Sequence, residues 1–175
     1  MSKRVATALQ VRPIARVVSS PLLRTRQTAE PIAKALNLRI DTDERLIEGT
    51  NVFEGTRLNA ARILQDPSTW RHLLNPLRPS WGEPYKDIAS RMMLALEDAW
   101  SSVKSGEVVL VSHQLPIWML HRWIAGVPLP HLPSQRRCSL ASVTTFRYVG
   151  GKWKEESYRE PASDLLEKSI DLGAV

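Results

Sequence analysis

Apolar and polar residues alternate along this chain in patterns that predict both strands and helices. Short apolar runs and one alternating stretch predict strands over residues 14–19, 38–40, 107–112, 142–149 and 152–158. Apolar positions at helical spacing predict helices over residues 1–10, 20–36, 85–104, 115–125 and 162–169. Strands that alternate with helices favour an α/β domain with a mostly parallel sheet, and Gly150-Gly151 predicts a terminal hairpin.

Residues with special backbone or capping properties predict where several helices begin and end. Ser20 is expected to cap the second helix and Pro21 to occupy its first position. The helix should run to about Leu36, and Pro31 should kink it or end its first part, because proline lacks the N–H that the helix needs. Asn37 and Gly106 are expected to close the helices before them. In the first helix, Val5, Ala8 and Leu9 fall on one side.

Composition places the chain among soluble, single-domain proteins. It has 175 residues, of which 43% are hydrophobic and 24% charged, so residues 1–175 are expected to form one domain. No apolar stretch approaches the roughly 20 residues of a membrane-spanning helix, and no signal peptide is apparent. The single Cys138 excludes an internal disulfide and favours a cytoplasmic location, with Cys138 as an ordinary loop residue.

A formal net charge of +6 indicates an anionic partner. The basic residues are scattered, without a run of five like charges, so we expect no nucleic-acid partner and no membrane partner. A small phosphorylated substrate or a phosphate ion remains as the expected partner. No metal-ligand spacing is present, so neither a metal nor another cofactor is expected.

Two junctions between a strand and a helix carry the candidate chemistry. Residues 17–29 contain Arg24 one turn inside a helix, and residues 109–114 place His113 directly after a strand. Ligands of open α/β sheets bind beyond the carboxyl ends of the strands, where helix N-termini favour anions. An arginine binds phosphate with two parallel hydrogen bonds, so Arg24 and His113 predict a phosphate site.

Four segments, in this order, resemble the histidine phosphatase superfamily, which includes the cofactor-dependent phosphoglycerate mutases and related phosphatases. They are SSPLLRTRQTAEPIA, RLIEGTNVFEG, GEPYKDIASRMMLAL and VVLVSHQLPIWML. The resemblance covers about residues 1–149 and implies a three-layer α/β/α fold like that of phosphoglycerate mutase. It also implies phosphoryl transfer to a histidine and then to water or a second hydroxyl.

The resemblance assigns roles to four residues. Arg24 matches an arginine and His113 a histidine that bind the phosphate, while Glu48 matches the carboxylate that protonates the leaving oxygen. Gln114 stands where the family usually has glycine, and we count it with Arg24 and His113 among the substrate-binding residues. Arg24, Glu48 and His113 are therefore the candidate catalytic residues.

One part of the family pattern is missing. The nucleophilic histidine belongs to an Arg-His-Gly motif at the end of the first strand, and none of the four histidines here lies in such a motif. We therefore expect an N-terminally shortened domain without its first strand, which lies beside the strand that ends at Ser112, and a chain that is inactive or nearly so. The sheet should show an open slot, a rearrangement, or an exposed edge that pairs with another chain in a homo-oligomer.

Three functions remain open. We favour a phosphomonoesterase that acts through a phosphohistidine; the alternatives are a non-catalytic phosphate-binding or scaffold protein and a phosphoglycerate mutase-type phosphotransferase. Nucleic-acid binding would rest on charge alone.

Arg136 and Arg137 are expected in a solvated loop, with a substrate role as the alternative. Trp70 and Trp81 are expected to pack in a lid rather than to form a binding platform.

Overall fold

Three parallel strands form the centre of the molecule. The computed structural model describes residues 1–49 and 82–166. Strands β1 (Ile14–Ser19), β2 (Ile40–Thr42) and β3 (Glu107–Val111) pair in the order β2-β1-β3. In the register of this sheet, Val17 lies opposite Ile40 on one side and Val109 on the other.

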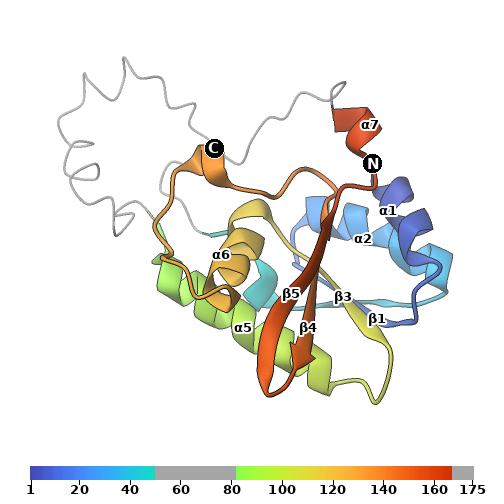
Figure 1. The fold of residues 1–175 in the computed structure, drawn as a ribbon. Coiled ribbons are helices and arrows are strands. Elements are labelled where there is room, and N and C mark those ends of the chain that lie inside the picture. Colours follow the sequence, from blue (N-terminus) through green and yellow to red (C-terminus); the bar gives the residue numbers. More distant parts are fainter. Residues whose placement is uncertain (50–81, 167–175) are drawn as a thin grey trace.

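Helices cover both faces of this sheet (Figure 1). Helices α1 (Ser2–Leu9) and α2 (Leu23–Leu36) lie on one face, and α5 (Tyr85–Ser101) and α6 (Gln114–Ile124) on the other. Side chains of a strand alternate between faces, so Val17 packs with α1 and α2 while Val18 packs with α5 and α6. The expected three-layer α/β/α fold is therefore present.

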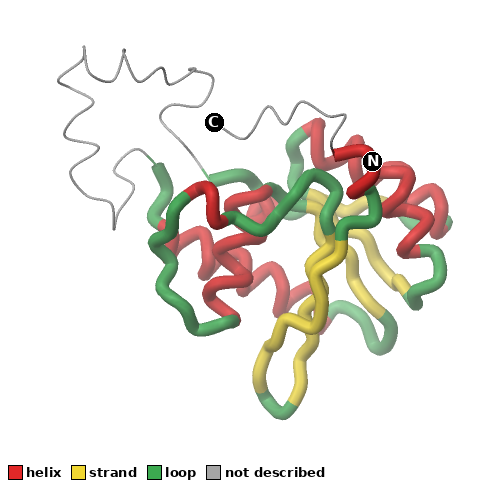
Figure 2. The backbone as a smooth tube through the Cα atoms, turned by 45° about the horizontal axis from the view of Figure 1, so that its top comes forward, coloured by secondary structure: helices red, strands yellow, loops and turns green. Residues whose placement is uncertain are grey.

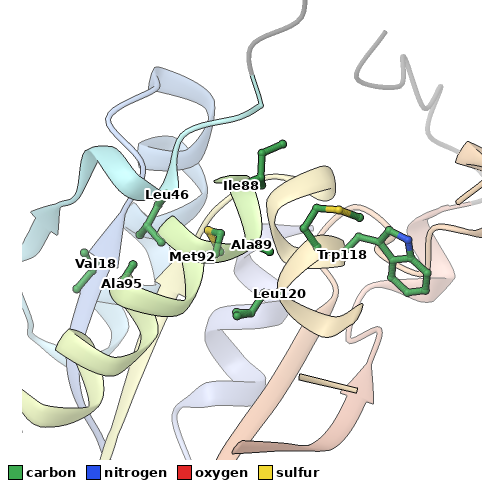
Figure 3. Close-up of a cluster of buried hydrophobic side chains, with 9 residues drawn as sticks. Val18, Leu46, Ile88, Ala89, Met92, Ala95, Trp118 and Leu120 are labelled. Atoms are coloured by element: carbon green, nitrogen blue, oxygen red, sulfur yellow. The ribbon is translucent and has the colours of Figure 1, made fainter. Parts of the chain in front are cut away.

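The larger buried cluster joins α5 and α6 to the sheet (Figure 3). Leu46, Ile88 and Met119 are completely buried in it, and Trp118 is buried except for 7% of its surface. Leu46 comes from the short 3-10 helix η1 (Glu44–Leu46), which directly precedes the Glu48 segment. This packing fixes the backbone next to Glu48.

Strands β4 (Val143–Val149) and β5 (Lys152–Arg159) form a separate antiparallel hairpin. Gly150 and Gly151 have φ angles of 59° and 80°, as the predicted tight turn requires. Figure 2 shows this hairpin projecting past the parallel strands. Among the described residues, β3 pairs with a strand on one edge only, the edge toward β1. A first strand missing from the family pattern, and pairing of this edge with another chain, stay predictions.

The predicted start of α2 was wrong. The helix begins at Leu23 rather than at residue 20, and Leu22 stands at its N-cap without a side-chain hydrogen bond. Ser20 is not the cap because its hydroxyl contacts His113 instead. Pro31 lies inside α2, which continues to Leu36 and ends, as predicted, on Asn37 in a left-handed conformation.

Other boundaries differ from the predictions by a few residues. In α1 the buried face contains Ala6 instead of Ala8. Both alanines neighbour Val5 and Leu9 on the helix, and packing against α2 decides which of them is buried. Helix α5 ends at Ser101, so Gly106 does not close it. Gly106 lies instead at a close approach to the carbonyl oxygen of Pro13, with φ +87°. Strand β2 is shifted to residues 40–42.

The end of the described chain is a short helix, α7 (Ser163–Leu166), and Arg4 of α1 forms an ion pair with Asp164. The predicted extension of α7 to residue 169 and the roles of Trp70 and Trp81 lie outside the described residues. A second 3-10 helix, η2, spans Pro133–Gln135. Within residues 1–49 and 82–166, no helix is long and apolar enough to cross a membrane.

Candidate functional site

The candidate residues meet at one edge of the sheet. Ser20 follows β1, Glu48 follows β2 and η1, and His113 follows β3. Because the three strands are parallel, their carboxyl ends lie side by side. The backbone N–H of Ser20 donates to the carbonyl of Val111 at 2.9 Å, which ties two of these ends together.

His113 is the centre of this group. It stands at the N-cap of α6 with an extended backbone, and its side chain is buried. Its Nδ1 accepts a hydrogen bond from Nε of Arg24 at 3.2 Å. Its Nε2 lies 2.9 Å from the hydroxyl of Ser20. Since Nδ1 is an acceptor, we assign the ring proton to Nε2, which then donates to Ser20.

The surroundings of His113 keep its ring uncharged. Burial lowers the pKa of His113 from 6.5 to about 4, and the positive charges of Arg24 and Arg91 act in the same direction. Near neutral pH the ring is therefore neutral, with an acceptor facing Arg24 and a donor facing Ser20. The ring therefore offers one hydrogen-bond donor and adds no positive charge of its own to the site.

Glu48 lies close to His113 without forming an ion pair, because the imidazole is neutral. Oε2 of Glu48 is 3.9 Å from Nδ1 of His113, and Oε1 accepts from the N–H of Gly49 at 2.9 Å. Burial raises the pKa of the Glu48 carboxyl, while the Gly49 hydrogen bond and the charges of Arg24, Arg136 and Arg91 oppose the increase. A raised pKa keeps the proton on this carboxyl to higher pH, as a general acid requires.

Arg91 and Ser112 support the site, although the sequence pattern indicated neither. The Arg91 guanidinium binds both carboxylate oxygens of Glu83, at 2.8 and 2.9 Å, and also the carbonyl of Arg45. The Ser112 hydroxyl donates to the carbonyl of Leu46 at 2.7 Å, which joins the end of β3 to η1. Nothing in the local sequence of α5 distinguishes Arg91 from a surface arginine, since its partners come from other segments.

Ser20 is a site residue and not the helix cap that the sequence pattern predicted. Its position between β1 and α2 was visible, and a serine there is usually a helix cap. The structure uses its hydroxyl to hold the Nε2 side of His113. This partner, His113, follows β3 and lies 93 residues away in sequence, so the sequence around Ser20 does not reveal it.

The loop between α6 and β4 also reaches the site. The Gln114 amide donates to the carbonyl of Cys138 at 3.2 Å, so this side chain fixes the loop, and its substrate contact stays a prediction. The Cys138 thiol is buried, which raises its pKa. Arg136 lies in this loop, half-buried, and its Nε donates to Nε2 of His131 at 2.9 Å. Arg137 is more exposed and pairs with Glu155.

The structure thus brings Arg24, His113 and Glu48 together as the sequence analysis predicted. Together they supply a guanidinium, a neutral imidazole donor and a carboxyl with a raised pKa, a set suited to a phosphoryl group. Among the described residues, no group of three or more His, Cys, Asp or Glu side chains is placed to hold a metal ion.

Comparison with known proteins decides the family. The sequence model of the histidine phosphatase superfamily (branch 1) matches residues 1–161. The chain belongs to the histidine phosphatase superfamily. Its curated relatives include a Mycobacterium tuberculosis protein of unassigned function, 46% identical over 160 residues that cover 91% of this chain and 79% of the relative. The probable phosphoglycerate mutase GpmB of Escherichia coli is 32% identical over 146 residues, covering 80% of this chain and 67% of GpmB.

Solved structures of this superfamily share the fold. YhfR of Bacillus stearothermophilus has a TM-score of 0.73 and 25% identity, over 88% of this chain and 78% of YhfR. A mycobacterial glucosyl-3-phosphoglycerate phosphatase in complex with inorganic phosphate has a TM-score of 0.67 and 26% identity, over 89% of this chain and 82% of that one. The α/β arrangement with a parallel sheet is therefore that of histidine phosphatases and phosphoglycerate mutase-like proteins.

Proposed function

We propose that the site formed by Arg24, His113 and Glu48 binds the phosphoryl group of a small phosphomonoester. The observation that carries this proposal is the hydrogen bond from Nε of Arg24 to the neutral, buried His113. A guanidinium held through Nε presents its two terminal nitrogens along one edge, which suits bidentate binding of phosphate oxygens. The phosphate-bound structure among the relatives supports this assignment.

Each residue has a separate role in the proposed phosphomonoesterase. Arg24 balances the charge of the phosphoryl oxygens, and the Nε2 proton of His113 turns from Ser20 to one of these oxygens. The phosphorus forms a bond to a nucleophilic histidine nitrogen as the ester P–O bond breaks. Glu48 donates its proton to the leaving ester oxygen, which departs as an alcohol. Water then attacks phosphorus as the P–N bond breaks, and the Glu48 carboxylate takes a proton from this water, so phosphate is released and both side chains return to their starting state.

The proposed nucleophile is absent from the 175 residues. No Arg-His-Gly motif occurs in them. His113 does not replace this motif, because its Nδ1, the nitrogen that lies 3.9 Å from Glu48, already accepts a hydrogen bond from Arg24. We therefore propose that this chain by itself binds phosphomonoesters and turns them over slowly or not at all. A non-catalytic phosphate-binding or scaffold protein is the second candidate, favoured by this missing motif. A mutase-type phosphotransferase is the third, favoured by the GpmB relatives.

Binding of inorganic phosphate, measured by isothermal titration calorimetry, tests the site. Arg24→Gln should weaken binding about 10- to 100-fold, since hydrogen bonds to charged groups contribute roughly 1.5–3 kcal/mol. Arg26→Gln is the matched control, because Arg26 is an exposed arginine of the same helix. Equal phosphate affinity in the wild type and Arg24→Gln, or an equal loss in Arg26→Gln, would refute the proposal.

Turnover of p-nitrophenyl phosphate separates the candidate functions. The 175-residue chain should bind phosphate but release little p-nitrophenol. A chain extended upstream of Met1 by its own coding sequence should turn the ester over if that sequence supplies an Arg-His-Gly motif. A phosphate-binding chain that stays inert in the extended form favours the scaffold, and transfer to an added hydroxyl compound favours the mutase-type enzyme.

A further inference from the structure

The loop between α6 and β4 brings a second arginine, Arg136, to the candidate site. The amide of Gln114, next to His113, holds the carbonyl of Cys138 at 3.2 Å. Burial raises the pKa of both Glu48 and the Cys138 thiol; the charge of Arg136 opposes this rise at Glu48, and the charge of Glu48 adds to it at Cys138. Residues 136–138 therefore lie within electrostatic reach of the carboxyl that is proposed to protonate the leaving group.

Arg136 is oriented by a neutral histidine. Nδ1 of His131 lies 2.9 Å from the carbonyl of Leu129, so this nitrogen carries the proton and donates. Its Nε2 is then the acceptor for Nε of Arg136 at 2.9 Å. The ring of His131 is held from two other elements, by Tyr85 of α5 at a centroid distance of 5.3 Å and by Trp118 of α6 at 6.1 Å.

The pair Arg136–His131 repeats the arrangement of Arg24–His113. In each pair a neutral imidazole accepts from Nε, which leaves the two terminal guanidinium nitrogens for another partner. Among the described residues these terminal nitrogens of Arg24 and Arg136 have no hydrogen-bond partner. Arg91, the third arginine near Glu48, differs because Glu83 and a carbonyl already occupy its terminal nitrogens.

Fixing the loop does not account for the orientation of Arg136. Gln114 and the ion pair of Arg137 with Glu155 already attach this loop to α6 and β5. The charges of Arg136 and Arg24 both act on Glu48, so Arg136 adds positive charge near the site beyond what one phosphoryl group needs. It suits a substrate with two anionic groups, because guanidinium binds carboxylate and phosphate oxygens in the same bidentate manner.

We propose that Arg136, positioned by His131, binds a second anionic group of the substrate, a carboxylate or a phosphate, while Arg24 and His113 bind the phosphoryl group. The proposal rests on the proposed function and narrows its substrate class to phosphomonoesters that carry a further negative charge. Arg136 is a substrate-binding residue in this scheme, and His131 is a positioning residue.

Matched phosphonates test this proposal by calorimetry. Phosphonoacetate and 3-phosphonopropionate carry a carboxylate, methylenediphosphonate carries a second phosphonate, and ethylphosphonate carries neither. The wild type should bind at least one of the doubly anionic ligands about tenfold or more tighter than ethylphosphonate. Arg136→Gln should remove this preference, with a smaller loss of affinity for ethylphosphonate, because the variant also removes one positive charge from the surroundings of the site. Arg137→Gln, the neighbouring arginine, should keep the preference. The ligand that shows it distinguishes a carboxylate from a second phosphate.

Two variants of His131 test its positioning role. His131→Phe keeps a ring against Tyr85 but removes the acceptor, so the preference should fall while binding of ethylphosphonate persists. His131→Gln keeps an acceptor near the former Nε2 and should retain most of the preference. If the wild type shows no preference for doubly anionic ligands, or if the preference survives Arg136→Gln, this inference is overturned and the proposed function is not. Failure of every phosphonate and of inorganic phosphate to bind overturns the proposed function as well.

Discussion

Protonation of His113 should destabilise the folded protein. The ring is buried, its Nδ1 faces the guanidinium of Arg24, and its pKa is lowered to about 4. An unfolded chain titrates this histidine near 6.5, so it binds a proton that the folded protein excludes between pH 6.5 and 4. The stability that the neutral ring supplies is present above pH 6.5 and is lost as the pH falls through 4.

The size of this effect follows from the two pKa values. Between 6.5 and about 4 the difference corresponds to roughly 3 kcal/mol, at about 1.4 kcal/mol for each tenfold change in the proton equilibrium. Glu48 has the opposite effect on stability as the pH falls. Its pKa is raised in the folded protein, so the folded protein binds this proton at a higher pH than the unfolded chain does. Total stability therefore does not isolate His113, and a comparison with a variant is needed.

The assay is urea unfolding of the wild type and His113→Gln at pH 7, 5.5 and 4. Between pH 7 and 4, the free energy of unfolding of the wild type should fall by up to about 3 kcal/mol more than that of the variant. A histidine NMR titration gives the pKa directly, and the signal that disappears in His113→Gln identifies the residue.

Two results would refute this reasoning. One is a His113 signal that titrates near 6.5, which would mean that neither burial nor the arginines act on the ring. The other is an equal pH dependence of stability in the wild type and His113→Gln. Arg24→Gln offers an internal check, since removal of this positive charge should move the pKa of His113 upward.

Two further predictions concern stability. Gly106→Ala should cost at least about 2 kcal/mol, because its Cβ would lie 2.5 Å from the carbonyl oxygen of Pro13 at φ +87°. Gly126→Ala is the control, because Gly126 has a φ of +67° and no atom within 4 Å of the added Cβ. Its free energy of unfolding in urea should fall by less; an equal fall would mean that backbone conformation, and not the contact with Pro13, causes the loss. Ser112→Ala should cost about 1 kcal/mol, because the carbonyl of Leu46 loses its donor. An unchanged thermal midpoint in this variant would show that the hydrogen bond contributes nothing.

The sequence indicated the elements wherever local chemistry sets them. Apolar runs located β1 and β3, helical spacing located α5 and α6, and Gly150-Gly151 located the hairpin turn, because each depends on residues that are neighbours in the chain. Boundaries were less certain. Pro31 did not end α2, since packing of Ile32 and Ala33 against the sheet outweighs one lost backbone hydrogen bond.

The candidate site was partly accessible from sequence for a related reason. Arg24 lies in the first turn of the helix after β1, and His113 lies two residues beyond the end of β3; parallel strands place such residues at one edge of a sheet. The family resemblance added Glu48. The sequence alone therefore determined the α/β class, the family pattern and three residues that the structure brings together.

Tertiary structure alone decided how these residues act. The charge state of His113 depends on burial and on a guanidinium 89 residues away in sequence, and neither is visible in a local pattern. The same holds for Ser20, which a helix-capping rule assigned to α2, and for Arg136, whose partner is fixed by α5 and α6. Local sequence sets backbone preferences, whereas protonation and hydrogen-bond partners depend on the dielectric environment and contacts that only the folded chain creates.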